Sequence, residues 1–168
     1  LAADRVKERG LKLHRVSAET DRPALAARKP WLWWIDGNCP AARQIVGDVK
    51  LGLTPVAQAH DGRRMHEAIA RIAQQVKQGQ APGAILFVPT AARAACYANR
   101  CPSLRAVVGT CPDAARQGVE QLGANVLIIE YPYHGPSAMR SMIGPFITAQ
   151  RAPLAAVDRH LKELGTCV

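Results

Sequence analysis

Two side chains in the second half of the chain have the chemistry for proton transfer. Cys111 stands directly before Pro112, where a helix is expected to begin, and the N-terminal end of a helix can lower the pKa of a thiol. His134 lies in a Tyr-Pro-Tyr-His turn and has the side chain of a general acid or base. Each has an ordinary alternative, because free cysteines are mostly small buried hydrophobes and a lone histidine commonly lies at the surface. Because of their side-chain chemistry, both are nevertheless candidate catalytic residues.

A long basic interval points to an anionic ligand. Between Glu67 and Asp113 the chain has no acidic residue, and its basic side chains there include Arg93 and Arg105. A positive field of this kind suits a phosphate, although a solvated basic face explains the pattern equally well. Arg93 in particular would either bind a phosphate or lie in a subunit interface.

The cysteines do not indicate a metal or a redox site. There are five of them, and an odd number without a secretory leader is typical of reduced thiols in a cytoplasmic protein. Cys96 and Cys101 are five residues apart, which is poor zinc-ligand spacing without partners. The chain has neither a GxGxxG nor a Walker A sequence. We therefore expect no metal and no cofactor.

The composition limits the classes of protein to which this chain can belong. The chain has 168 residues, of which 48% are hydrophobic and 21% charged, as in one ordinary globular domain. No apolar run approaches the length of a membrane span. The net charge of +9 alone would permit nucleic-acid binding, but the basic residues are scattered and aromatic residues make up only 5%. We see no nucleic-acid motif and do not favour such a partner.

The hydrophobic pattern predicts a regular alternation of strands and helices from residue 31 onward. Short apolar runs rich in Ile, Leu and Val are typical of parallel strands that are covered on both faces. Strands are expected at residues 31–35, 55–59, 84–88, 105–108 and 125–129. Helices are expected at 40–49, around 65–76, at 91–99 and 112–122, from Pro136 onward, and at 154–164. The predicted fold is a doubly wound parallel five-stranded α/β sheet with helices on both faces, in three layers.

Residues 1–30 do not continue this alternation. They would form a short helix at 4–9, a strand at 11–16 and a proline-bounded polar stretch. We predict an N-terminal extension or arm at 1–30 and a single α/β domain at 31–168.

In sheets of this kind, ligands bind at the carboxyl ends of the strands. Those ends carry Asp36, Thr90, the pair Thr110-Cys111, and Glu130, and expected helix N-termini follow them directly. Phosphate binding there is physically reasonable. Asp36 and Thr90 each have a structural alternative as the N-cap of the next helix.

Residues 83–136 resemble the RpiB/LacA/LacB sugar-phosphate isomerase family, which includes ribose-5-phosphate isomerase B. The family typically reads G-I-L-I-C-G-T-G-I-G-M-S-I-A-A-N-K after its third strand, and residues 84–100 match it at Thr90 and Asn99. Further along, Ala115-Arg116, the run Ala-Asn-Val-Leu at 124–127, and Gly135-Pro136 match at the family's spacing. The resemblance implies the doubly wound fold and a phosphosugar ligand.

The same comparison shows which family groups this chain lacks. The resemblance places the family's catalytic cysteine at Val88 and the alternative glutamate base at Ala94. The ring-opening histidine corresponds to Thr110, and a phosphate-binding arginine corresponds to Pro132. Three glycines of the anion-binding loop are replaced, by Pro89, Ala91 and Arg93. Since an aldose–ketose isomerase needs a positioned base, the standard family reaction is not expected.

Three functions remain open on the sequence. The first is a non-catalytic family member that binds a phosphosugar or another small anion, or serves as a subunit beside an active paralogue. The second is an aldose–ketose isomerase with a relocated base, and the third is a nucleic-acid or protein-binding module on the same scaffold. The resemblance also implies a homodimer or higher oligomer. The candidate catalytic residues are Cys111, His134 and Asp36, and the candidate ligand-binding residues are Thr90, Arg93, Asn99 and Thr110.

Overall fold

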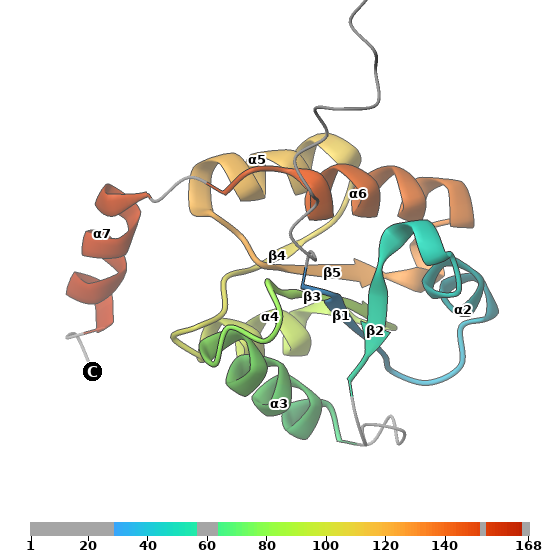
Figure 1. Ribbon diagram of the computed structural model, residues 1–168, viewed down its shortest axis with the longest axis horizontal. Coiled ribbons are helices and arrows are strands. Elements are labelled where there is room, and N and C mark those ends of the chain that lie inside the picture. The colour runs from blue at the N-terminus through green and yellow to red at the C-terminus, as the bar shows by residue number, and fades with distance from the viewer. Residues whose placement is uncertain (1–28, 57–63, 152–153, 166–168) are drawn as a thin grey trace, which may run out of the picture.

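A five-stranded, entirely parallel sheet forms the centre of the molecule (Figure 1). This computed structural model describes residues 29–56, 64–151 and 154–165. The strands are β1 (Trp31–Ile35), β2 (Leu53–Pro55), β3 (Ala84–Val88), β4 (Ala106–Val108) and β5 (Val126–Glu130). Their order across the sheet is β2-β1-β3-β5-β4. The predicted doubly wound α/β class is thereby confirmed.

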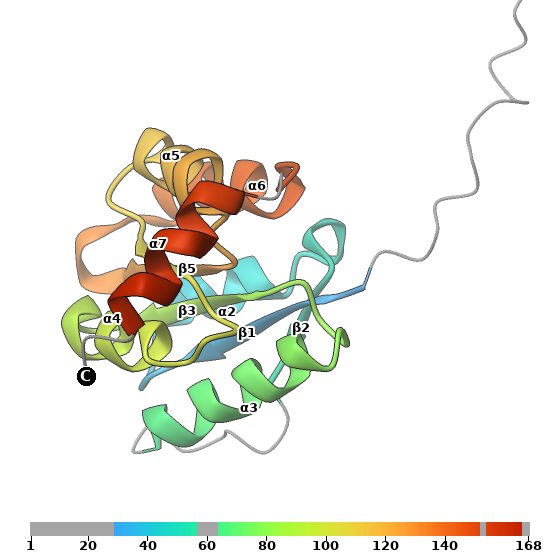
Figure 2. The same cartoon turned by 90° about the vertical axis from the view of Figure 1, so that its left-hand side faces the viewer.

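Helices cover both faces of the sheet and make three layers, as Figure 2 shows from the side. One face packs against α3 (Met65–Lys77) and α4 (Ala91–Asn99). The other packs against α2 (Pro40–Val46), α5 (Pro112–Leu122) and α6 (Pro136–Thr148). Single-turn helices lie at Val49–Leu51 and Tyr131–Tyr133.

Strand alternation divides the core into two halves. The side chains of Leu86 and Val88 pack with α3 and α4, whereas Ile85 and Phe87 pack with the helices on the other face. All five residues of β3 are buried, because the strand lies in the middle of the sheet between β1 and β5. This explains why the central strands are continuous apolar runs without alternating polar residues.

The last helix, α7 (Ala155–Gly165), stands at the side of the domain (Figure 1). Asp158 on α7 forms an ion pair with Arg105, which also donates from Nη1 to the carbonyl oxygen of Leu122 at 3.0 Å. Arg105 therefore has a structural partner, although it belongs to the basic interval that suggested an anionic ligand.

Some boundaries differ from the sequence-based expectation. The helix expected at 40–49 ends at Val46, since Gly47 caps it and a single-turn helix follows. The strand expected at 55–59 is observed at Leu53–Pro55, where it pairs with β1. Proline has no N–H to continue a ladder, which favours a short edge strand here. Residues 57–59 and the elements expected at 4–9 and 11–16 lie outside the described residues.

Candidate functional site

The strand order marks the carboxyl ends of β1 and β3 as the place where a sheet of this kind has its ligand crevice, and this region is called the crevice. From β1 the chain moves to β2 on one side, whereas β3 and the later strands lie on the other side. The connections after β1 and β3 therefore leave the sheet in opposite directions. This is the topological switch point at which open α/β sheets bind ligands.

Three residues form a row across the carboxyl ends of the central strands. Ile35 is the register partner of Phe87, and Val88 is the register partner of Glu130. The backbone N–H of Asp36 still donates to the carbonyl oxygen of Phe87 at 2.8 Å. Asp36, Val88 and Glu130 thus follow one another on three adjacent strands. With strands about 4.8 Å apart, the two carboxylate-bearing residues have Cα atoms roughly 10 Å apart.

The three side chains of this row share the face of the sheet that α4 covers. Val88 belongs to the core half that packs against α3 and α4, and so do Trp34 and Ile128. Asp36 follows Trp34 by two residues and Glu130 follows Ile128 by two, so each repeats that orientation. Val88 is therefore flanked by two carboxylates on the same side of the sheet.

The carboxylate of Glu130 caps α4. Its Oε1 accepts a hydrogen bond from the backbone N–H of Ala91, the first residue of the helix, at 2.5 Å. A negative charge at this position is stabilised by the free N–H groups and the dipole of the helix. Thr90 occupies the N-cap position, but its side chain makes no capping hydrogen bond. The capping role expected as the alternative for Thr90 is thus performed by a residue of β5.

Asp36 lies partly buried in the crevice. Burial raises the pKa of its carboxyl, and the positive charge of Arg93 opposes that rise. Its carbonyl oxygen accepts a hydrogen bond from the Tyr131 hydroxyl at 3.1 Å. The alternative role of Asp36 as a helix cap is wrong, because Cys39 is the N-cap of α2 and its Sγ accepts from the N–H of Ala42 at 3.4 Å.

Tyr131 packs against the turn that follows β1. Burial raises the pKa of its hydroxyl, and the neighbouring Cys39 and Asp36 add to the effect. Gly37 has a positive φ of 83°, which favours glycine, and a Cβ there would lie 3.3 Å from the Tyr131 hydroxyl oxygen. The turn after β1 is therefore fitted closely to Tyr131.

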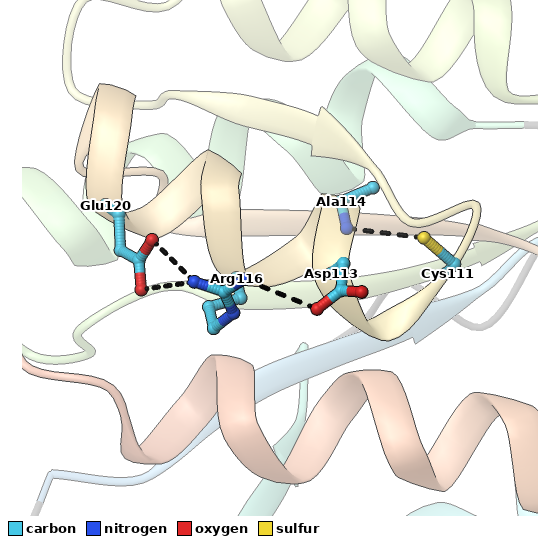
Figure 3. A network of polar contacts seen from close by, with 5 residues as sticks. All are labelled: Cys111, Asp113, Ala114, Arg116 and Glu120. Atoms are coloured by element: carbon cyan, nitrogen blue, oxygen red, sulfur yellow. Dashed lines mark hydrogen bonds and ion pairs between the residues drawn. The ribbon is translucent and has the colours of Figure 1, made fainter.

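Cys111 serves as the N-cap of α5. Its Sγ accepts from the backbone N–H of Ala114 at 3.4 Å (Figure 3). On the same helix, the guanidinium of Arg116 binds Asp113 and Glu120. Thr110 precedes this cap and is exposed at the end of the edge strand β4. The thiol is exposed and so is not the inert buried cysteine of the alternative interpretation.

The other predicted residues separate into two groups. Arg93 lies exposed on the first turns of α4, near Asp36, and His134 is half-buried after the turn at Tyr131–Tyr133. Asn99 lies at the far end of α4, where its side chain pairs with both backbone groups of Ala106, at 2.8 and 3.1 Å. Because Ala106 begins β4, Asn99 lies at the amino ends of the strands, away from the crevice at their carboxyl ends.

Sequence reasoning gave no role to Glu130 and Tyr131 beyond their place at a strand end. Glu130 ends the otherwise apolar run of β5. An acidic residue directly after four apolar ones was the sequence signal that could have marked it as a site residue. Within the described part of the chain, no group of three or more His, Cys, Asp or Glu side chains has the arrangement of a metal site. No helix there is long and apolar enough to cross a membrane.

A sequence model of the Ribose/Galactose Isomerase family matches residues 54–164, which is well over half of the chain. The chain belongs to this family. Among solved structures, ribose-5-phosphate isomerase B of Clostridium thermocellum superposes with a TM-score of 0.70 at 19% identity, covering 83% of this chain and 99% of that one. The Thermotoga maritima enzyme gives 0.69 at 18% identity, with coverage of 80% and 97%. The type B enzyme of Trypanosoma brucei gives 0.67 at 18%, with coverage of 84% and 99%. No curated protein matches the sequence.

The structure shows where the positions lie that the resemblance assigned to the family's catalytic groups. Val88, where the resemblance places the family's cysteine, is fully buried at the end of β3. Ala94, at the alternative base position, is also fully buried, on the side of α4 that packs against the sheet. The strands on either side of Val88 lead into the carboxylate-bearing residues Asp36 and Glu130.

Proposed function

We propose that this chain is a Ribose/Galactose Isomerase family protein that binds a phosphosugar but does not perform the family's standard isomerisation. The observation that carries the proposal is the buried valine at position 88, between Asp36 and Glu130. Moving a proton between adjacent carbons needs a titratable group within hydrogen-bond reach. Neither Val88 nor Ala94 has one, whereas Asp36, Arg93 and Tyr131 lie near one another at the carboxyl ends of the strands.

The ligand side of the proposal rests on Asp36, Arg93 and Tyr131. Carboxylate and phenol groups at the strand ends suit sugar hydroxyls, and the guanidinium of Arg93 suits a phosphate. Arg93 is exposed and close enough to Asp36 to influence its ionisation. We include Thr90 and Thr110 as flanking hydroxyl groups, and leave Asn99 out because of its contact with Ala106.

Two measurements test this function. Ribose 5-phosphate at about a hundred times its Kd should raise the Tm by roughly 5–10 °C, because a ligand specific for the folded state stabilises by about 2.7 kcal/mol at that ratio. An assay of ribose 5-phosphate isomerisation should show no enzymatic turnover. Turnover at ordinary enzymatic rates contradicts the loss of chemistry, and an unchanged Tm with a panel of phosphosugars contradicts the binding role.

One observation favours an isomerase with a relocated base as the second candidate. Glu130 is the register partner of Val88 on the neighbouring strand and points to the same side of the sheet, so its carboxylate lies beside the position where the resemblance places the family's cysteine. In this case Glu130 would accept the proton and would have to release the N–H of Ala91 to do so.

We also propose that the protein is a cytoplasmic homodimer or higher oligomer, alone or with a paralogue. Family membership supports the oligomer. The free cysteines support a cytoplasmic location. Light scattering coupled to size exclusion would give the mass in solution, and a monomer at micromolar concentration would contradict this part.

A further inference from the structure

A cavity lies at the amino ends of the strands, the opposite end of the sheet from the crevice. It has a volume of about 670 Å³ and is formed where β1, β2 and β3 begin, against the end of α6. Its walls include Trp31, the first residue of β1, Gly52 just before β2, and Pro82 shortly before β3. Small-molecule sites commonly have volumes of about 300–1,000 Å³. The cavity therefore has the size of a ligand site, and it lies at the amino ends of the strands that carry Asp36 and Val88 at their carboxyl ends.

Arg151 is the central charged group of this cavity. Its guanidinium lies over the rings of Trp31 and Phe146, with the central carbon 4.6 and 4.9 Å from their centroids. Carbonyl oxygens accept three of its N–H groups, those of Phe146 at 2.7 Å, Ala124 at 2.9 Å and Ala149 at 3.0 Å. A guanidinium has five N–H donors, so two of them have no acceptor among the described residues. The side chain is thus held in one orientation before anything binds.

The charge of Arg151 has no acidic partner in the described part of the chain. The ion pairs there involve Arg64, Arg105 and Arg116, and none involves Arg151. Burial lowers the pKa of Arg151 to about 10, so it remains a cation at neutral pH. Burying a charge without a counter-charge is costly, and such charges are normally paired. An anion arriving from solution would supply the missing partner.

Two lysines add to this field. Lys29 and Lys50 both line the cavity, and none of its lining residues is acidic. The nearest acid along the chain is Asp48, whose carboxylate accepts the backbone N–H of Lys50 at 3.1 Å and is not part of the wall. Three cations around one hollow with an aromatic and aliphatic wall suit a small organic molecule with several negative charges.

We propose that this cavity, lined by Lys29, Lys50 and Arg151, is a binding site for a small organic anion carrying phosphate. Residues 1–28, which lead directly into Lys29, have seven Lys or Arg residues against four Asp or Glu, so their charge does not favour them as the occupant. The site is independent of the crevice at the carboxyl ends of the strands and of the function proposed for it. A phosphate group would lie between the two lysines and the free N–H groups of Arg151.

Calorimetric titration with inorganic pyrophosphate tests the site directly. The full chain should bind pyrophosphate, and the double substitution Lys29→Gln with Lys50→Gln should raise the Kd at least tenfold. Lys77→Gln removes an exposed lysine at the end of α3 and is the matched control, for which the Kd should not change. Arg93→Gln removes the cation of the crevice at the carboxyl ends of the strands, so it should abolish any pyrophosphate binding there while the Kd of the site at Lys29, Lys50 and Arg151 stays the same. The single substitution Lys50→Gln gives the same comparison with less change to the protein.

Each contrary result overturns the proposal in a recognisable way. The site is excluded if the unsubstituted chain does not bind pyrophosphate at about 10 mM. That concentration is about ten times a Kd of 1 mM, so even a site of millimolar Kd would be nearly saturated. Equal losses in the Lys77 and Lys50 variants would mean non-specific attraction to a basic surface. A loss confined to Arg93→Gln would assign the anion to the carboxyl-end crevice, and would support the function proposed there while refuting this second site.

Discussion

Glu130 and Ala91 are 39 residues apart in the chain, yet the carboxylate of one caps the helix that begins with the other, at 2.5 Å. This bond joins the end of β5 to the start of α4, directly beside Val88. The carboxylate of Glu130 places one of the protein's own negative charges at the N-terminus of α4. Without it, this helix N-terminus would be open to an anionic ligand. The stability and the chemistry of the crevice therefore depend on the same side chain.

Replacing Glu130 with Ala should lower the free energy of unfolding by about 1–2 kcal/mol, because α4 loses a charged cap. Urea unfolding followed by circular dichroism measures the change. Thr90→Ala at the formal N-cap position is the control and should cost much less, since the Thr90 side chain makes no capping bond. Equal costs for the two substitutions would show that Glu130 is not the effective cap.

If any isomerase activity is found, Glu130→Gln should abolish it, because glutamine keeps the size of the side chain but cannot accept the proton. Cys111→Ala should leave at least half of the rate, since the thiol serves as the cap of α5. Initial rates with ribose 5-phosphate provide the comparison. A Glu130→Gln protein with undiminished turnover would exclude this residue as the base and return attention to Cys111 and His134.

Asp36 should destabilise the folded protein at neutral pH. Burial raises the pKa of its carboxyl, so the folded state binds the proton more tightly than the unfolded state does. The sign follows from linkage: stability is lost as the pH rises from the unfolded value near 3.8 through the higher folded value, and the loss is complete above it. Asp36→Asn should therefore raise the Tm at pH 7 relative to the parent chain, with little difference at pH 3. A higher Tm for the parent chain at pH 7 would mean that attraction to Arg93 outweighs the cost of burial.

Two glycines within helices should differ in how much an alanine substitution destabilises the protein. At Gly118 on α5, a Cβ would lie 2.8 Å from a methyl carbon of Val107, so Gly118→Ala should lower the free energy of unfolding by about 1–2 kcal/mol. At Gly144 on α6, no atom outside its chain neighbours and the helix's own backbone lies within 4 Å of the added carbon. The gain in helix propensity is opposed by Pro145, which disfavours helical backbone for a preceding residue with a Cβ, so Gly144→Ala should change the free energy of unfolding by less than about 1 kcal/mol. Urea denaturation of both variants measures the difference. A loss at Gly144 equal to that at Gly118 would contradict the role of the contact with Val107.

Local sequence determined most of the secondary structure, because helix and strand periodicity depend on near neighbours. The strands at Trp31–Ile35 and Ala84–Val88 and the helices at Ala91–Asn99 and Pro112–Leu122 have the predicted bounds. The absence of a titratable group at Val88 is likewise a property of the sequence alone. The family resemblance was also readable there, since it consists of residues at fixed spacing within one stretch.

Only the tertiary structure decided which of these residues meet. Strand order cannot be read from local patterns, and it is the insertion of β5 between β3 and β4 that brings Glu130 beside Val88 and Ala91. Asn99 matched the family, yet the length of α4 carries it to the amino ends of the strands, where it binds Ala106. Arg151 had no distinguishing local signal, because its environment is assembled from Trp31, Ala124 and Phe146, which are separated along the chain. Contacts between distant segments depend on how the whole sheet packs, and one-dimensional spacing contains no measure of that.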